Sequence, residues 1–394
     1  MTVIRKKRRH QRKQFAAIAA SFAALDRRSQ YRIQVYTDNL TGPNYVFAML
    51  CSTDDRFRRI MRMKKDTYYA LRNWLLANTG LKTSRISVDE KMMIFFHIVA
   101  QGSSIRVVSD RFMRSNDTVY RAFHQVLDAL MVLARVIIRP VDDRPHRKIV
   151  NNGKFFPWFG NVSGALDGTH FKVRIEGNAF EREVWRNRKG KLSTNVLAAC
   201  DFDGRFTYVL AGWEGSANDA KVFNNAVDRD DLVIPKQKYM LGDAGYATGK
   251  RILTPYRGTR YHLQEQAQAQ LKPRTPEELY NLRHAQLRNA IERAFGRWKN
   301  TFRIFKEDPP CLRIDTMMKA IYATAGLCNF LLEYGEMDPD EPVELDEEAH
   351  INDEDQANDF SLAERQGGVS SPTAGYRDQI AKRMWDSYLK FRKD

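Results

Sequence analysis

The sequence predicts an α/β core, a mixed sheet flanked by helices, with an all-α domain in front of it. Residues 57–140 carry apolar side chains at spacings of three and four, which is typical of amphipathic helices. After residue 150 the pattern changes to short apolar or alternating runs, which indicates strands. A chain of 394 residues is long enough for two such domains, each with its own core.

The charge of the chain is unevenly distributed. The formal net charge is +16, although residues 333–359 hold thirteen acidic residues and no Lys or Arg. Removing those thirteen negative charges leaves +29 on the rest of the chain, which favours a polyanionic partner such as nucleic acid over a merely solubilising surface. Residues 5–13 hold seven Lys or Arg, as in a nuclear address or a phosphate-binding arm, with a plain charged tail as the alternative.

Membrane and secretory proteins are disfavoured. The longest apolar run, residues 92–100, is too short to span a bilayer, and the N-terminal region lacks the apolar stretch of a secretory signal. The four cysteines have no CxxC spacing, which is typical of reduced thiols in an intracellular protein. We therefore expect no membrane partner.

The first helices are marked by caps. Ser87 and Glu90 form a predicted capping box, and the helix that follows ends at Gly102. A short helix over 105–114 comes next, and Ser115 caps a longer apolar one. Three helices with short connections fit a helix-turn-helix module, but a packing or dimerisation domain remains equally open.

The strand region begins after prolines at 140–145. Two apolar runs, 195–200 and 206–210, surround an Asp-Gly pair and predict a hairpin. Asp201 and Asp203 are therefore expected to be turn residues, with metal ligation as the weaker alternative.

Three carboxylates stand where side chains of this type are unusual. Asp167 lies in an alternating run, on the face of its apolar residues. Asp243 lies between glycines directly after the predicted strand 236–241, where open sheets place functional groups. Glu292 lies at the edge of the apolar stripe of a helix that Thr275 caps.

Each carboxylate alone also has an ordinary explanation, a turn for either aspartate and a solvated ion pair for the glutamate. Together they form a set of oxygen ligands of the kind that hard divalent cations prefer. Two such ions can activate the attacking oxygen and stabilise the leaving oxygen of a phosphodiester. The three residues therefore predict metal-dependent chemistry on DNA.

Five segments resemble the transposases of the PIF/Harbinger group and the domesticated nucleases related to them, which belong to the DDE superfamily. The segments, which also match in order and rough spacing, are ALDGTH (165–170), NRKG with STN (187–195), WEGSAND (213–219), GDAGY (242–246) and IERAFG (291–296). The resemblance covers about 155–335 and extends more loosely to the helical region. It departs from the family at Glu214, Asn218 and Ala247, where Pro, His and Pro are usual.

The resemblance implies a ribonuclease H-like core and a DNA endonuclease and transposase. Such an enzyme cuts transposon ends and transfers the 3′-hydroxyl to target DNA. The resemblance assigns catalytic and metal-ligating roles to Asp167, Asp243 and Glu292. It implies Mg²⁺ or Mn²⁺ as the metal, with two ions expected. Asp219 is a secondary candidate that would orient a ligand. The expected DNA contacts are basic residues of the matched segments and the helical module, namely Arg188, Lys189, Arg293, Arg297, Arg111 and Arg114.

Two other functions stay open, a domesticated nuclease that no longer transposes and a non-enzymatic DNA-binding chromatin adaptor. The expected partners are double-stranded DNA, a Myb-like accessory protein and further copies of the chain in a homo-oligomer. We expect the protein in the nucleus, with shuttling to the cytoplasm left open.

The sequence divides into five predicted parts, which are a basic arm at 1–30, a helix-turn-helix-like domain at 31–140, the ribonuclease H-like catalytic domain at 150–335, a flexible acidic linker at 336–375 and a basic C-terminal helix at 376–394.

Overall fold

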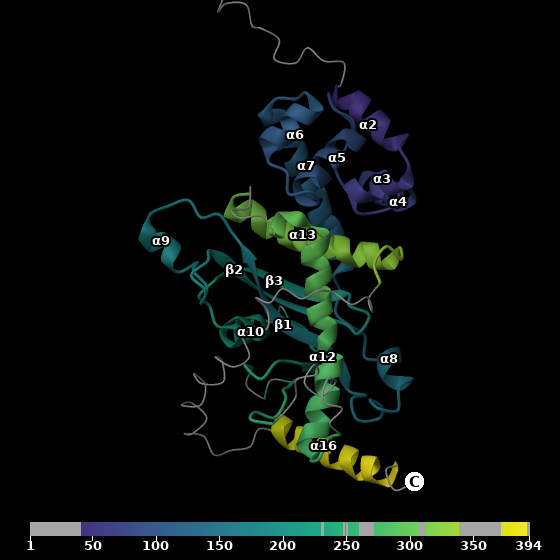
Figure 1. The fold of residues 1–394 in the computed structure, drawn as a ribbon, viewed down its shortest axis with the longest axis vertical. Helices are drawn as coiled ribbons and strands as arrows, with labels where there is room; N and C mark the ends of the chain where they lie inside the picture. Colours follow the sequence, from purple (N-terminus) through teal and green to yellow (C-terminus); the bar gives the residue numbers. More distant parts are fainter. Residues whose placement is uncertain are drawn as a thin grey trace, which may run out of the picture. The chain divides into compact units, whose positions relative to one another are not determined.

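The computed structural model describes residues 41–229, 232–246, 249, 251–259, 272–306, 312–338 and 372–391. The predicted basic arm at 1–30 and most of the predicted acidic linker lie outside these residues. From Gly42 onward, the described residues form one compact unit (Figure 1).

The N-terminal part of this unit is entirely helical, as predicted. Its helices are α2 (Gly42–Leu50), α3 (Asp54–Met61), α4 (Lys65–Asn78), α5 (Val88–Val99), α6 (Ile105–Phe112) and α7 (Asn116–Ile137). The short helix α8 (Arg147–Val150) leads from this part to the sheet.

The predicted caps form, with one exception. The side chains of Ser87 and Ser115 accept the backbone N–H groups of Glu90 and Thr118, at 3.1 and 3.2 Å. However, the Glu90 carboxylate does not return to the cap. It is buried and accepts two hydrogen bonds from Arg114, so the predicted capping box is only half formed. Pairing of a buried charge with arginine takes precedence over the local cap because an uncompensated buried carboxylate is costly.

The sheet is mixed, in the strand order β3-β2-β1-β4-β5. The strands are β1 (Val162–Lys172), β2 (Ser193–Cys200), β3 (Phe206–Glu214), β4 (Tyr239–Leu241) and β5 (Ile252–Leu253). The first three are antiparallel neighbours, whereas β4 runs parallel to β1 and β5 parallel to β4. The mixed sheet predicted from the sequence is thus confirmed, while its ribonuclease H-like character and the helix-turn-helix assignment stay predictions.

The β2–β3 turn has the predicted form. Asp201 Oδ1 accepts the backbone N–H groups of Asp203 and Arg205, each at 2.9 Å, and Gly204 takes a positive φ of 75°. Asp201 is therefore a turn residue, because its carboxylate satisfies the amides of the loop.

Helices cover both faces of the sheet. The long helix α12 (Pro276–Thr301) contacts β1, β2 and β4, and the helix α10 (Asp219–Asp228) contacts β2 (Figure 1). Thr275 caps α12 as predicted and accepts the N–H of Glu278 at 3.2 Å. A five-residue helix, α9 (Ala179–Glu183), lies in the β1–β2 connection and has no buried residue.

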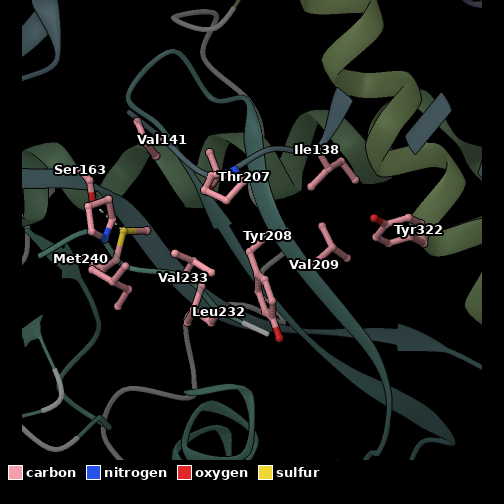
Figure 2. Close-up of a pocket in the computed structure, with 13 residues that line it drawn as sticks. Ile138, Val141, Ser163, Thr207, Tyr208, Val209, Leu232, Val233, Met240 and Tyr322 are labelled. Carbon is pink, nitrogen blue, oxygen red and sulfur yellow. Dashed lines mark hydrogen bonds between the residues drawn. The ribbon is translucent and has the colours of Figure 1, made fainter. Parts of the chain in front are cut away.

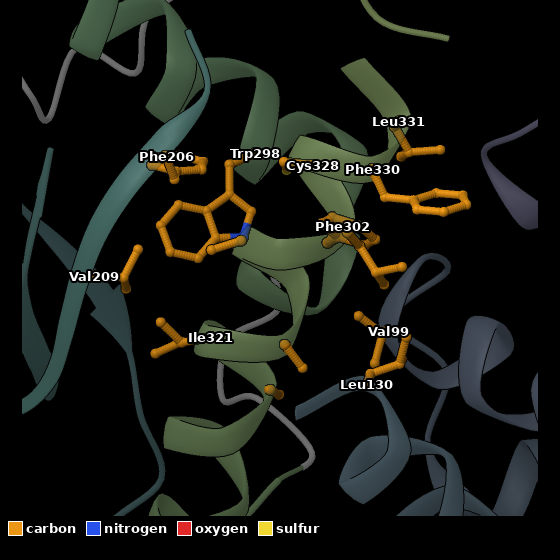
Figure 3. Packing of buried hydrophobic residues seen from close by; sticks show 14 of the residues in the cluster. Val99, Leu130, Phe206, Val209, Trp298, Phe302, Ile321, Cys328, Phe330 and Leu331 are labelled. Carbon is orange, nitrogen blue, oxygen red and sulfur yellow. The ribbon is translucent and has the colours of Figure 1, made fainter. Parts of the chain in front are cut away.

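The helical part and the sheet share one apolar core. Helix α13 (Ile314–Glu333) packs against both α7 and β3. Figure 3 shows Trp298 of α12 beside Phe206 of β3, with Val99 and Leu130 of the helical part in the same cluster. Trp298 also donates its indole N–H to Thr324 of α13 at 2.9 Å. The predicted parts 31–140 and 150–335 are therefore joined by a continuous interior.

The last described helix is α16 (Pro372–Phe391), which contacts α12 and β5 and overlaps the helix predicted at 376–394. The short 3₁₀ segment η1 (Arg303–Phe305) follows α12. Among the described residues, no helix has both the length and the apolar character needed to cross a membrane. Of the cysteines in the described chain, Cys200 and Cys328 are buried and Cys51 is exposed, all three with free thiols.

Candidate active site

Asp167 and Asp243 follow paired positions of two neighbouring strands. Ala165 of β1 pairs with Leu241 of β4 in the parallel ladder. Asp167 lies two residues after Ala165, within β1, and Asp243 lies two residues after Leu241, just beyond the end of β4. The charges of both aspartates act on the buried Tyr246, so the two carboxylates belong to the same region of the molecule.

A backbone N–H group close in the sequence donates a hydrogen bond to each of the two aspartates. Asp243 is buried, and its Oδ1 accepts the N–H of Gly245 at 2.6 Å. Asp167 is half-buried, and its Oδ1 accepts the N–H of Gly168 at 2.8 Å. Each carboxylate is therefore oriented by a glycine of its own segment.

Glu292 joins the site through an arginine. Arg288 lies one turn before it on α12, and its Nη2 donates to Glu292 Oε1 at 2.5 Å. The Nη1 of the same guanidinium donates to Asp167 Oδ2 at 2.8 Å. One cation thus connects the carboxylates of Asp167 and Glu292, which are 125 positions apart in the chain.

Tyr246 lies within electrostatic range of the aspartates. Its ring is fully buried against Phe223 of α10, and its hydroxyl has no hydrogen-bond partner among the described residues. Burial raises the pKa of Tyr246 well above its usual value, and the charges of Asp219, Asp167 and Asp243 raise it further. A buried hydroxyl without a protein partner is a common sign of a bound water or ion.

Asp219 approaches β1 from the other face of the sheet. It is the first residue of α10, and its Oδ1 accepts a hydrogen bond from Asn195 of β2 at 2.5 Å. A Cβ on Gly168 would overlap the Asp219 carboxyl, so only glycine admits this approach. Since side chains alternate along a strand, Asp167 faces α12 while Gly168 faces α10.

These residues fit a divalent cation in chemistry. Asp167 within β1, Asp243 just after β4 and Glu292 on α12 supply three oxygen-donor side chains, and a cation already compensates two of them. Within the described part of the chain, no three His, Cys, Asp or Glu side chains are gathered in ligand positions.

Of the predicted DNA contacts, Arg188 and Lys189 lie within electrostatic range of His170. They belong to the β1–β2 connection, and their charges lower the pKa of His170, whose largest perturbation is burial. His170 is on β1 three residues after Asp167, and its Nδ1 lies 3.1 Å from Ser193 Oγ. The connection therefore places positive charge within electrostatic range of β1.

Arg293 and Arg297 face a different part of the core. Both lower the pKa of the buried Cys200 thiol, although burial raises it overall. Arg297 is itself buried, and a Cβ on Gly204 would overlap its guanidinium. The structure thus packs Arg297 against the β2–β3 turn and not on a surface open to DNA.

The two arginines of the helical part also differ. Arg111 is exposed, and its guanidinium lies 5.7 Å from the ring centroid of Tyr45. Arg114 instead donates to both oxygens of the buried Glu90. Arg111 therefore lies exposed over Tyr45, while Arg114 stabilises the packing of α5 against the α6–α7 turn.

The residues that contact the carboxylates could not be predicted from the sequence. Arg288 was visible only as one of several cations along the helix, yet its spacing of four from Glu292 is the spacing of a helical ion pair. Asn195 and Tyr246 lie inside matched segments without any pattern that indicates which carboxylate they meet. Their roles depend on long-range packing.

A pocket of about 220 Å³ lies beside the edge strand β3. Both apolar side chains, such as Val209 and Leu232, and polar ones, such as Ser163 and Thr207, line it (Figure 2). Among the described residues that line it, none is acidic, basic, histidine or cysteine.

Comparison with known proteins agrees with this geometry. Residues 166–329 match the model of a DDE superfamily endonuclease, and residues 37–132 match a domain of unknown function, DUF8040. The chain is 22% identical over 277 residues to the Arabidopsis thaliana protein named "Protein ALP1-like". That alignment covers 64% of this chain and 65% of the relative, just under two thirds of its length. No solved structure matches the chain significantly.

The endonuclease match begins one residue before Asp167 and includes Asp243 and Glu292. The two matches together confirm the resemblance to Harbinger-type DDE nucleases that the five sequence segments indicated.

Proposed function

We propose that this chain, similar over residues 166–329 to DDE superfamily endonucleases, is a metal-dependent nuclease that hydrolyses phosphodiester bonds in double-stranded DNA. Its catalytic carboxylates are Asp167, Asp243 and Glu292. The observation that carries the proposal is the Arg288 guanidinium that joins Glu292 to Asp167, while Asp167 and Asp243 each follow two residues after the paired Ala165 and Leu241.

Within this proposal the three carboxylates hold Mg²⁺ or Mn²⁺. Bound there, a pair of such ions supplies an activated attacking oxygen and stabilises the leaving oxygen. The backbone N–H groups of Gly168 and Gly245 keep the aspartate oxygens oriented. Arg188 and Lys189 bind DNA phosphates beside the site. The support is that both lie within electrostatic range of His170 on β1.

Plasmid cleavage by the purified chain tests the catalytic assignment. Glu292→Gln removes a negative charge at nearly constant volume, so we expect loss of Mg²⁺- or Mn²⁺-dependent cleavage with folding and DNA affinity nearly unchanged. Glu277→Gln, on the first turn of the same helix, is the matched control and should cleave like the wild type. Wild-type cleavage by the Glu292 variant would refute the assignment.

We further propose strand transfer as the second step, in which the freed 3′-hydroxyl attacks target DNA. The alternative is a domesticated nuclease that cuts without transposing. Terminal inverted repeats on either side of the gene, together with joined products in an assay with labelled ends, support transfer. Cleavage without joined products supports the domesticated nuclease, and DNA binding without any cleavage supports a chromatin adaptor.

Selection of the DNA ends is proposed to require an oligomer or a Myb-like accessory protein, in the nucleus. The support is that the helical part offers few cations to DNA, since Glu90 holds Arg114 and Asp117 pairs with Arg121 at 3.0 Å. Footprinting the purified chain on a terminal repeat and on scrambled DNA tests this proposal. Sequence-selective protection by the chain alone would contradict it.

A further inference from the structure

One guanidinium lies between two of the proposed metal ligands. The Arg288 side chain is 12% exposed, and those of Asp167 and Glu292 are 18% and 24% exposed. Its two terminal nitrogens donate to different carboxylates, at 2.8 Å to Asp167 Oδ2 and at 2.5 Å to Glu292 Oε1. The planar fork of arginine suits such bridging between oxygens.

This contact leaves Asp167 with both oxygens engaged. Oδ1 accepts the N–H of Gly168, and Oδ2 accepts Nη1 of Arg288. A guanidinium also repels a divalent cation at the same oxygens, and at low exposure this repulsion is weakly screened. Arg288 and a divalent cation therefore compete for Asp167 and Glu292.

We propose that Arg288 is a displaceable counter-ion of this site. In the metal-free protein its guanidinium neutralises Asp167 and Glu292, and divalent binding requires it to leave at least one of them. The inference rests on the proposed metal-binding role of the carboxylates and adds a residue that sets their metal affinity.

Mn²⁺ binding to the full chain tests this directly, by calorimetry and by the loss of the free-ion electron paramagnetic resonance signal. Arg288→Met keeps the apolar length of the side chain and removes its charge. We expect this variant to bind Mn²⁺ about tenfold more tightly than the wild type, the scale on which neighbours of ligands tune metal affinity.

Thermal unfolding provides a second readout. In EDTA the Arg288→Met variant should unfold several degrees below the wild type, because two partly buried carboxylates lose their counter-ion. Mn²⁺ should raise the unfolding temperature of the variant by more than it raises that of the wild type. If the Met variant does not fold, Arg288→Gln, whose amide can still donate to one carboxylate, should shift Mn²⁺ affinity in the same direction.

A control on the same helix separates charge loss in general from charge loss at the site. Arg283 lies on the same helix in the electrostatic range of Tyr388 on α16, so Arg283→Met should bind Mn²⁺ like the wild type. Equal or weaker Mn²⁺ binding by the Arg288 variants would overturn the counter-ion role.

Two carboxylate variants distinguish failure of this inference from failure of the proposed function. If Asp167→Asn and Glu292→Gln abolish Mn²⁺ binding while Arg288→Met leaves it unchanged, only the counter-ion inference fails. If neither carboxylate variant alters Mn²⁺ binding, the proposed metal site fails and the inference fails with it.

Discussion

Asp167 shows how a charge can be accommodated on the apolar side of a strand. Its two oxygens accept from the Gly168 backbone and from Arg288, so the half-buried carboxylate is hydrogen-bonded and electrically compensated. Burial without such partners would be costly. Arg288, from a helix distant in the sequence, therefore stabilises the charge of Asp167 on the apolar side of the strand.

Asp219 should support catalysis without being essential to it. Asp219→Asn keeps the side-chain volume and removes the charge next to Gly168, on the face of β1 opposite Glu292. We expect the cleavage rate to fall by about tenfold, less than for Glu292→Gln. The matched control is Asp228→Asn at the far end of α10, which should cleave at the wild-type rate. A complete loss with Asp219→Asn would place this carboxylate among the ligands.

His97 makes the stability of the helical part depend on pH. Its ring is buried, Nε2 lies 2.7 Å from the Tyr45 hydroxyl, and Phe112 packs edge-on against it. Burial, and secondarily the charge of Arg111, lowers the pKa of His97 from 6.5 to about 4. The folded protein therefore holds the neutral ring, while the unfolded chain takes up a proton below pH 6.5.

The stability contributed by this neutral ring is complete above pH 6.5 and is lost as the pH falls toward 4. Between about pH 7 and 5 the expected loss from His97 is about 2 kcal/mol. Urea unfolding of the wild type and of His97→Gln at both pH values measures it. Both proteins keep the buried His284. The difference between the pH dependences of their unfolding free energies therefore comes from His97. Equal pH dependence of the two proteins would contradict the assignment.

At the scale of elements, α12 combines two tasks on different faces. Arg288 and Glu292 meet the carboxylate of β1, while Trp298 packs into the shared core against β3 and α13. The position of Glu292 therefore depends on the same packing that stabilises the fold. Truncating Trp298 would disturb both the packing of the shared core and the position of Glu292.

The crossing of α7 and α13 requires a glycine. A Cβ at Gly326 would come within 2.7 Å of the Cα of Ala134, so the two helices touch through their backbones. We expect Gly326→Ala to lower the free energy of unfolding by about 1 kcal/mol or more, since overpacking outweighs the gain in helix propensity. Gly375→Ala is the control, because nothing lies near that Cβ on α16. It should leave stability equal or raise it by up to about 1 kcal/mol.

At the scale of the whole molecule, the acidic residues after α13 fall into two groups. Glu336 belongs to the fold, because its buried carboxylate accepts from the Lys64 backbone at 2.9 Å and from Thr67 at 2.7 Å. Residues 339–359 lie outside the described chain. A deletion meant to test competition with DNA should therefore start after residue 338. It should tighten nonspecific DNA binding if the acidic segment covers the basic surface.

DNA affinity of the whole chain should depend steeply on salt, because phosphate contacts dominate binding by a protein this basic. Six phosphate contacts would lower the affinity by about a thousandfold between about 50 and 200 mM salt. Fluorescence anisotropy of a labelled duplex measures the slope, with Arg188→Gln and Lys189→Gln each expected to reduce it. A flat plot of affinity against salt would contradict electrostatic binding.

The sequence alone was enough to predict the local elements and the candidate carboxylates. Caps such as Thr275, the hairpin turn at Asp201 and the α12 stripe depend on interactions a few residues apart, which a linear pattern records. Tertiary structure alone decided the partners: Arg288 between Asp167 and Glu292, Arg114 on Glu90, and a core shared by the helical part and the sheet. Most of these contacts join residues far apart in the chain, where neither spacing nor charge specifies which of many cations meets a given carboxylate.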